Sequence, residues 1–335
     1  MFGLFSRGRV KLFLKKHDKI FGKEAIIVTG ISDYSLKDTF ECGQCFRFVK
    51  LNSGSLLGSD AKELSDEYMT VVRGKLIFVA QRSRDELIFF GLSDDDFLNI
   101  AVPYFALDTD YAAIKADVIA HTESEFLRSA AECAGGIRIL RQEPWETVFS
   151  FIISQNNNIP RIKKIIRHIC AAYGENLAVS SGLDSCPISI DGEKICEEKC
   201  RECGLCYSFP TATDVASDPD LLLPSRPGFR FKYLVDAAEK ISSGAVDLKG
   251  IEDAHSYEYT LSELAKIKGV GAKVASCAAL FAFSNLDAFP IDVWMRRAID
   301  EYFGGELDPG TLGEYAGVAQ QYIFHYIRAL SGEND

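Results

Sequence analysis

Hydrophobic residues between positions 24 and 102 occur in short runs that polar turn residues separate. The runs are rich in β-branched and aromatic residues, which favour strands, and they cover 24–32, 45–51, 68–74 and 75–81. Turn-forming residues such as those at 52–55 lie between two of them. The pattern predicts an antiparallel sheet in this part of the chain.

From Asp85 onward the apolar residues follow the three- and four-residue steps of helices, and this pattern continues to the end of the chain. Residues 145–155 form an apolar segment after Pro144, a residue that the first turn of a helix tolerates. Asparagines at 156–158 interrupt the pattern, and another helix is expected to begin near Pro160. Its buried face is marked by Ile162, Ile165, Ile166, Ile169 and Tyr173.

These patterns predict an α+β fold, with an N-terminal antiparallel twisted sheet followed by a mainly α-helical domain. We expect a basic N-terminal segment at 1–23, a β-rich domain at 24–128 and a helical domain at 129–335. The helical domain would carry a cysteine-rich insertion at 186–206 and a helical hairpin at 260–283.

The segment 260–283 is expected to form a helix, a tight turn and a second helix. Thr260 with Glu263 has the spacing of a capping box and is expected to open the first helix. Gly269, Val270 and Gly271 end it, because glycine adopts backbone angles that other residues resist. The second helix should bury Val274, Cys277, Ala278 and Phe281. Unpaired N–H groups at its start suit a phosphate oxygen.

Lys273 and Asp292 are the candidate reactive residues of this region. Lys273 falls in the first turn of the second helix, where the helix dipole disfavours an ammonium and so favours a neutral, nucleophilic amine. Asp292 stands before the next helical segment. The simpler alternatives are a helix N-cap for Asp292 and a phosphate contact for Lys273. Because both lie on one hairpin region, we expect them to face a common cleft.

Composition describes an ordinary soluble chain of 335 residues, 47% of them hydrophobic and 25% charged. No apolar run has the length of a membrane span, so we expect no membrane partner. The net charge of −11 counts against nucleic acid unless basic residues gather locally. Ten cysteines without a secretion signal indicate a reducing compartment. Those in apolar surroundings, expected to be buried, are Cys42, Cys45, Cys133, Cys170 and Cys277.

Two further segments leave alternatives open. Residues 1–23 are basic, with Asp18 as the single acidic residue, and are expected to form a loosely ordered terminus, a nucleic-acid-binding arm or a targeting helix. Residues 181–208 contain a dense group of cysteines, namely Cys186, Cys196, Cys200, Cys203 and Cys206. The last four are a candidate site for a structural zinc ion or iron–sulfur cluster, with free thiols in a surface insertion as the alternative.

Five motifs in order resemble the 8-oxoguanine DNA glycosylases of the helix-hairpin-helix-GPD superfamily. One is the hairpin with Lys273 and the later Pro290, Ile291, Asp292 and Val293; the others lie at 42–47, 154–159, 228–230 and 315–320. A lone hairpin is a weak signal, whereas five motifs in the family's order are a strong one. The resemblance extends over roughly residues 26–326.

The resemblance implies a role for each matching residue. Lys273 would attack the sugar C1′ while Asp292 stabilises the positive charge that develops on the sugar. Residues around the extruded base would be Gly43, Cys277, Gln320 and Phe324, with the Gly43 carbonyl accepting the N7 hydrogen that 8-oxoguanine has and guanine lacks.

The DNA contacts that the resemblance implies come from other segments. Asn156 would fill the gap left by the base, Arg161 and Arg230 would read the orphaned cytosine, and Phe229 would be a wedge. The phosphate contacts would come from Gly269, Val270 and Gly271. The family often has histidine where this chain has Trp294, so this chain lacks the phosphate or pocket contact of that histidine.

Our hypothesis is a bifunctional DNA glycosylase and abasic-site lyase that acts on 8-oxoguanine, preferably opposite cytosine. The alternatives are a monofunctional alkylated-base glycosylase and a non-catalytic helix-hairpin-helix DNA-binding protein. We expect a monomer that needs no cofactor for catalysis. We expect it in the cytoplasm with the nucleoid, or in a nucleus or organelle if the source is eukaryotic.

Overall fold

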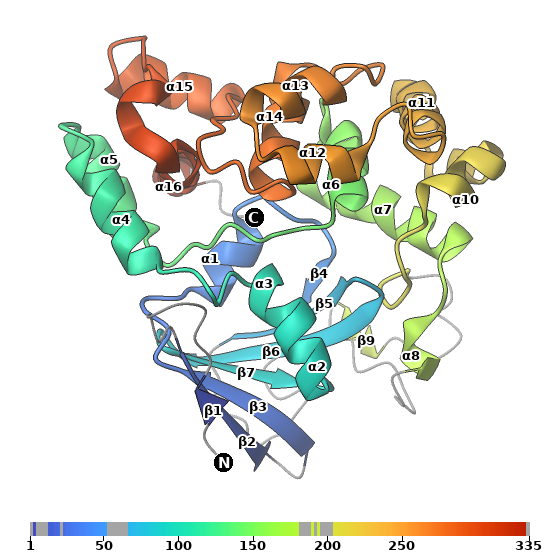
Figure 1. Ribbon diagram of the computed structural model, residues 1–335, viewed down its shortest axis with the longest axis horizontal. Coiled ribbons are helices and arrows are strands. Elements are labelled where there is room, and N and C mark those ends of the chain that lie inside the picture. Colours follow the sequence, from blue (N-terminus) through green and yellow to red (C-terminus); the bar gives the residue numbers. More distant parts are fainter. Residues whose placement is uncertain are drawn as a thin grey trace. The chain divides into compact units, whose positions relative to one another are not determined.

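The computed structural model describes residues 3–4, 13–20, 23–51, 66–180, 189–190, 193–194 and 204–332 (Figure 1). By packing, the chain divides into two compact units, each assembled from three stretches. The first unit comprises Met1–Ile31, Phe46–Thr109 and Asn156–Phe231, and the second comprises Ser32–Cys45, Asp110–Gln155 and Lys232–Asp335. Each unit draws on both sides of the expected boundary at residues 128 and 129, so the division into consecutive domains stays a prediction.

Among the described residues, the first unit holds every strand and part of the helices. The strands are β1 (Gly3–Leu4), β2 (Leu14–Ile20), β3 (Lys23–Thr29), β4 (Phe48–Lys50), β5 (Asp66–Val72), β6 (Lys75–Ser83), β7 (Glu86–Phe90), β8 (Ser189–Ile190) and β9 (Glu193–Lys194). Its helical elements are α2 (Asp94–Asp96), η1 (Phe97–Ala101), α3 (Val102–Tyr104), α7 (Ile159–Tyr173), α8 (Leu177–Ser180), α10 (Ala212–Ser217), η2 (Pro219–Ser225) and η3 (Gly228–Arg230).

The second unit is helical. Its elements are α1 (Leu36–Glu41), α4 (Tyr111–Ala120), α5 (Glu125–Cys133), α6 (Pro144–Ser154), α11 (Phe231–Ser242, whose first residue belongs to the first unit), α12 (Leu248–Ala254), α13 (Tyr257–Leu264), α14 (Ala272–Phe281), α15 (Val293–Tyr302), η4 (Pro309–Tyr315) and α16 (Ala316–Ser331). α14 packs on α6 and α13, and α16 packs on α5 and α15. No described helix is long and apolar enough to cross a membrane.

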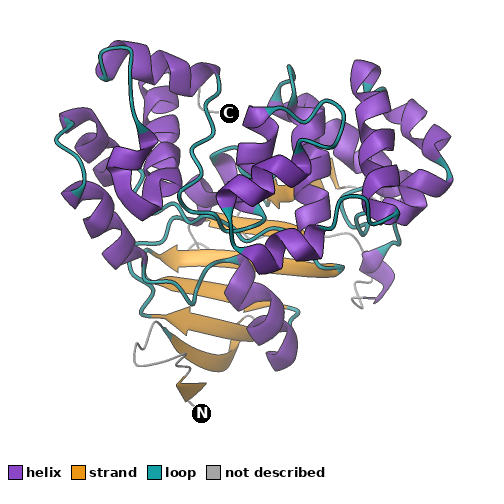
Figure 2. Ribbon diagram, turned by 45° about the horizontal axis from the view of Figure 1, so that its top comes forward, coloured by secondary structure: helices purple, strands orange, loops and turns teal. Residues whose placement is uncertain are grey.

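Seven strands form one antiparallel sheet in the order β1-β2-β3-β7-β6-β5-β4 (Figure 2). The predicted α+β class is confirmed. The expectation of helix from Asp85 onward was wrong, because Glu86–Phe90 is the strand β7, paired with both β3 and β6. Leu14–Ile20 is also a strand, fully paired with β3, although it lies in the segment that was expected to be loose.

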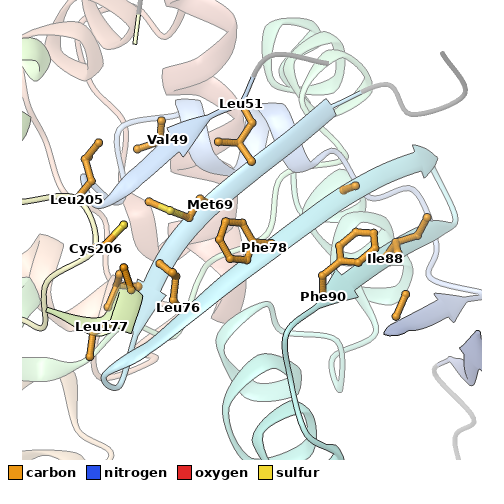
Figure 3. Close-up of a cluster of buried hydrophobic side chains, with 14 of the residues drawn as sticks. Val49, Leu51, Met69, Leu76, Phe78, Ile88, Phe90, Leu177, Leu205 and Cys206 are labelled. Carbon is orange, nitrogen blue, oxygen red and sulfur yellow. The ribbon is translucent and has the colours of Figure 1, made fainter. Parts of the chain in front are cut away.

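Both faces of the central strands are buried, which explains why they read as continuous apolar runs rather than alternating ones. On one face, Phe89 makes edge-to-face contacts with Phe97 and Phe105 of the helical segment that follows β7. On the other face, Ile88 and Phe90 join a hydrophobic cluster (Figure 3). The cluster contains Leu51, Met69, Phe78, Leu177, Leu205 and Cys206, among others.

The hairpin begins one turn earlier than predicted. Ser256 is the N-cap of α13, and its side chain accepts from the Tyr259 amide. Thr260 is therefore not the cap: it lies inside the helix, fully buried, and its hydroxyl contacts the Ser256 carbonyl and Asn285. The capping-box spacing was misleading because a serine that caps equally well stands four residues upstream.

Four of the five cysteines expected in the core are buried, namely Cys42, Cys45, Cys170 and Cys277. Cys133 is exposed. It is the last residue of α5, where the buried side of the helix is provided by Leu127, Ala130 and Ala131 instead.

Candidate active site

A cavity of about 50 Å³ lies in the second unit. All six residues predicted for catalysis or for the base pocket line it, namely Gly43, Lys273, Cys277, Asp292, Gln320 and Phe324. They come from the segment after α1, from α14, from the start of α15 and from α16. The fold of the second unit therefore brings together residues that are up to about 280 positions apart in the sequence.

Lys273 enters the cavity from the first turn of α14 and is half-buried. Its Nζ lies 5.3 Å from the centroid of the Phe151 ring. One turn further along α14, burial raises the pKa of the Cys277 thiol to about 11, although the neighbouring Lys273 charge opposes that shift. Cys277 is therefore a neutral thiol at physiological pH, not a competing nucleophile.

Asp292 is both a helix cap and a cavity residue. Its Oδ1 accepts a 2.9 Å hydrogen bond from the Met295 amide and so caps α15. The same carboxylate faces the cavity that Lys273 lines. The N-cap interpretation and the chemical interpretation are thus compatible, because a carboxylate has two oxygens and the cap uses one.

Gly43 requires its glycine for conformational reasons. Its φ is +79°, and a Cβ atom built there would lie 3.7 Å from the Phe324 ring, an ordinary contact. The next residue, Gln44, holds this loop in place: its Nε2 donates to the carbonyls of Thr39 and Arg138. Its Oε1 accepts from the Leu140 amide. No role was predicted for Gln44, because the sequence around a glutamine beside two cysteines does not indicate that it is buried.

At about 50 Å³ the cavity has room for a few water molecules. A base enters only when lining side chains move. Phe324 is half-buried on α16 and lies opposite Gly43, with the Arg328 guanidinium 5.5 Å from the centroid of its ring.

The turn of the hairpin is held from α11. Gly269 has φ +79°, and a Cβ there would lie 2.5 Å from the Tyr233 ring, so no larger residue fits. Asp236, which is buried, accepts a 2.7 Å hydrogen bond from the Lys268 amide. Its carboxylate also pairs with the ammonium groups of Lys240 at 2.9 Å and Lys268 at 3.3 Å. The turn at Gly269, Val270 and Gly271 is thereby fixed, although the Val270 amide, which was predicted as a phosphate contact, already donates to the Ile267 carbonyl at 3.1 Å.

The predicted cytosine-reading residues gather in the first unit. Arg230 is 5% exposed, and its guanidinium donates to the carbonyls of Asn156 at 2.8 Å and Pro227 at 3.2 Å. Burial, and then the charge of Arg161, lower the pKa of Arg230. Phe229 is 52% exposed and lies under the Arg230 guanidinium, as expected of an aromatic wedge presented to a partner.

The basic surface of α7 is smaller than the number of its basic residues suggests, which are Arg161, Lys163, Lys164 and Arg167. Arg161 and Lys164 are exposed, and Asn158 caps the helix through the Arg161 amide. Lys163 instead lies over the Phe48 ring, with Nζ 3.6 Å from its centroid. The sequence alone does not indicate which of the basic residues of this helix packs against a neighbouring strand.

The basic N-terminal segment is largely neutralised where it is described. Lys15 pairs with Asp94, Lys16 with Asp18, and Lys19 with Glu24. Arg7, Arg9 and Lys11 lie outside the described residues.

The candidate metal site stays a prediction. Cys186, Cys196, Cys200 and Cys203 lie outside the described residues, and Cys206 is buried in the hydrophobic cluster on the sheet. Within the described part of the chain, no group of histidine, cysteine and carboxylate side chains has the arrangement of a metal site.

Comparison with known proteins gives a consistent result. Residues 26–148 match the family model described as 8-oxoguanine DNA glycosylase, N-terminal domain. The chain is 29% identical to the N-glycosylase/DNA lyase of Saccharomyces cerevisiae over 296 residues, which cover 83% of this chain and 69% of the yeast protein.

Solved structures also match nearly the whole chain. MBOgg1 in complex with a low-affinity DNA ligand has a TM-score of 0.75 and 33% identity, and the match covers 95% of this chain and 99% of that one. The Clostridium acetobutylicum 8-oxoguanine glycosylase/lyase, in complex with double-stranded DNA containing cytosine opposite 8-oxoG, also has a TM-score of 0.75, with 28% identity and coverage of 95% and 98%.

The role of Asp236 gives a testable prediction. Burial disfavours its charged form, but hydrogen bonds from Lys268 and Lys240 outweigh that effect and lower its pKa. A group whose pKa is lower in the folded state than its unfolded value of about 3.9 stabilises the fold above that pH. The stabilisation is lost as the pH falls through the folded-state pKa. We therefore expect Asp236→Asn to lower the free energy of unfolding by about 1–3 kcal/mol at neutral pH.

The measurement is urea unfolding of the wild type and of Asp236→Asn from neutral pH down to about pH 2.5. The difference between them should shrink as the pH drops below about 4. Asp300→Asn, at an exposed position of α15, is the matched control and should change stability little at any pH. A difference for Asp236→Asn that is independent of pH would contradict the assigned role.

Proposed function

The chain belongs to the 8-oxoguanine DNA glycosylase and DNA lyase family, and from this membership we propose which of its residues carry out each step. The protein excises 8-oxoguanine from duplex DNA, with cytosine as the opposite base, and cleaves the resulting abasic site. The observation that carries the residue assignment is that Lys273 and Asp292, far apart in sequence, line one cavity.

In the first step, the amine lone pair of Lys273 attacks C1′ of the lesion nucleotide. The bond from C1′ to N9 breaks, and its electrons leave with the base, which takes up a proton. Positive charge develops on the sugar ring as that bond lengthens, and the Asp292 carboxylate stabilises it electrostatically. The amine takes the place of the second carboxylate that many glycoside hydrolases use.

In the second step, the sugar ring opens and the lysine adduct becomes a Schiff base. Loss of a proton from C2′ then drives the bond from C3′ to its oxygen to break, which releases the strand with its phosphate. The iminium accepts the electrons of the C2′ bond, so the same Lys273 that displaces the base also drives β-elimination. Hydrolysis of the Schiff base restores the free amine.

Selection of the damaged base is assigned to the backbone of Gly43. A carbonyl there accepts a hydrogen bond from N7–H of 8-oxoguanine, whereas normal guanine has an acceptor at N7 and would set acceptor against acceptor. Phe324 would stack on the base from α16. The left-handed backbone of Gly43, held by the buried Gln44 amide, supports this assignment.

Recognition of the cytosine opposite the lesion is assigned to Asn156, Arg161 and Arg230. Their proximity in the first unit supports it, since Arg230 donates to the Asn156 carbonyl and lies close enough to Arg161 for the charge of Arg161 to affect its pKa. The exposed Phe229 would enter the gap beside the cytosine.

We propose that catalysis requires no metal and no cofactor, because an amine and a carboxylate suffice for both steps. A structural zinc ion or iron–sulfur cluster held by Cys196, Cys200, Cys203 and Cys206 stays a separate proposal. Metal analysis of the purified protein decides it: stoichiometric zinc or iron supports the site, and fully active metal-free protein rules it out. The proposed location is the cytoplasm with the nucleoid, or a nucleus or organelle.

The nucleophile is tested by borohydride reduction. The wild type should form a covalent adduct with duplex DNA carrying 8-oxoguanine, and Lys273→Gln should abolish the adduct and lower base excision about a thousandfold or more. Lys266→Gln is the matched control, because Lys266 is a hairpin lysine that pairs with Glu263 and does not line the cavity. Trapping by Lys273→Gln would move the nucleophile elsewhere.

The two roles of Asp292 are separable by substitution. Asparagine caps helices about as well as aspartate, so Asp292→Asn should unfold at nearly the wild-type urea concentration while it loses about 100- to 1000-fold in single-turnover excision. Asp292→Ala should lose the same activity and also about 1 kcal/mol of stability. If Asp292→Asn keeps wild-type excision, the carboxylate is only a cap.

Opposite-base reading is tested with lesions paired to cytosine or adenine. The wild type should act faster opposite cytosine, and Arg161→Gln should reduce that preference about 5- to 100-fold. Lys164→Gln, one turn along the exposed side of α7, should instead weaken binding to both duplexes alike. Equal rates opposite the two bases for the wild type would reject the assignment.

A further inference from the structure

Two consecutive glutamines of α16 reach the same cavity. Gln320 and Gln321 are 3% and 4% exposed, and both line the cavity with Lys273 and Asp292. Successive helix residues point about 100° apart, so an interior polar residue beside Gln320 would ordinarily face packing neighbours. Gln321 has no role in the mechanism described above.

The two side-chain amides form one hydrogen-bonded pair. Gln321 Nε2 donates to Gln320 Oε1 at 2.7 Å. Gln321 Oε1 is buried and has no hydrogen-bond partner among the described residues. Buried polar atoms are nearly always paired, so an amide oxygen without a partner, on a residue that lines a cavity, indicates that a ligand completes it.

The pair offers the cavity one acceptor beside one donor. Gln321 supplies the open oxygen, and Gln320 supplies its Nε2, since its own oxygen is already used. Turning over both amides together would exchange the two roles but would still leave one oxygen and one N–H group of the pair for a ligand. A ligand that matches this arrangement carries an acceptor adjacent to a donor.

We propose that Gln321 is a second specificity-determining residue, which reads the pairing edge of the extruded base jointly with Gln320. This inference rests on the proposed function, because the occupant is 8-oxoguanine. Its O6 accepts from one amide, and its adjacent N1–H donates to the other. The edge is thus recognised by two amides whose orientations depend on each other, rather than by one glutamine that can rotate alone.

The test separates base reading from sugar chemistry. Gln321→Met keeps the length and nearly the volume of the side chain but removes the amide. It should slow single-turnover excision of 8-oxoguanine about 10- to 100-fold, the loss expected for a hydrogen bond to a buried group. Cleavage of a preformed abasic site, which has no base to read, should proceed at the wild-type rate.

A base analogue completes a double-mutant cycle, in which one change is made in the protein and the other in the base. A 2-amino-8-oxopurine lacks O6 and the N1 hydrogen but keeps N7–H and O8, so it removes both partners of the glutamine pair from the base side. Wild type should excise it slowly, and Gln321→Met should add little further loss, because the two changes delete the same contacts.

Gln321→Glu supplies a pH readout that a packing role would not give. A protonated glutamate both donates to Gln320 and accepts from the base, as glutamine does, whereas an ionised one repels the Gln320 oxygen. Burial raises the pKa of such a carboxyl. Excision relative to wild type should therefore be nearly normal at low pH and should fall as the pH rises, with abasic-site cleavage unchanged.

Two results would overturn the inference. One is wild-type excision of 8-oxoguanine by Gln321→Met, and the other is a parallel loss of abasic-site cleavage, which marks a structural role. Failure of the wild type to cut either substrate would instead reject the proposed function itself.

Discussion

The hydrogen bond from the Met295 amide to Asp292 is the contact on which the candidate active site depends. A carboxylate with one oxygen bound to a helix N-terminus has its second oxygen fixed in direction. The backbone of α15, rather than side-chain packing, therefore positions the acid. Lys273 is placed in the same manner, by the first turn of α14, and its flexible side chain is confined beside the Phe151 ring.

The backbone that surrounds these groups is held by buried polar side chains. Gln44 uses its whole amide to tie the Gly43 loop to the segment at 138–140. Asp236 plays the same part for the hairpin turn. Each holds a loop whose glycine has a positive φ, and loops of this kind have no regular hydrogen-bonding pattern of their own. Specific side-chain partners are the physical substitute for such a pattern.

The sequence predicted site residues where the chemistry requires a particular residue type. It did not predict those whose position depends on how an element packs against its neighbours. Lys273, Asp292, Gly43 and Gln320 were predicted because each belongs to a motif, and all four line one cavity. Gln321 was not, since only the position of α16 decides that it faces the cavity.

The errors in the fold have the same origin. Thr260 and Ser256 are both competent caps, and the extent of packing decides between them. β7 was assigned to helix because four apolar residues beside a charged turn fit either periodicity, and the pairing with β3 and β6 decides for a strand. In the same way, the sequence does not indicate that Lys163, one of several basic residues of α7, lies over the Phe48 ring of β4.

Arg161 and Lys273 carry a positive charge at positions where it does not stabilise the helix. Arg161 and Lys273 both lie in the first turn of a helix that has no acidic residue in that turn. A positive charge there is destabilising by about 0.3–1 kcal/mol, so stability would favour aspartate or glutamate. Lys232 of α11 and Lys249 of α12 have the same placement, although Lys249 pairs with Glu252 and Asp253. Other helices, such as α2, α5 and α10, have acidic residues in their first turns. Positions where the local rule is broken without a compensating contact are expected at functional sites. In the proposed function Arg161 reads the opposite base and Lys273 is the nucleophile, so both positions are selected by chemistry rather than by helix stability. The acidic net charge of the chain and its DNA-binding function are consistent, because a few basic residues placed against the preference of their helices are sufficient where the DNA binds.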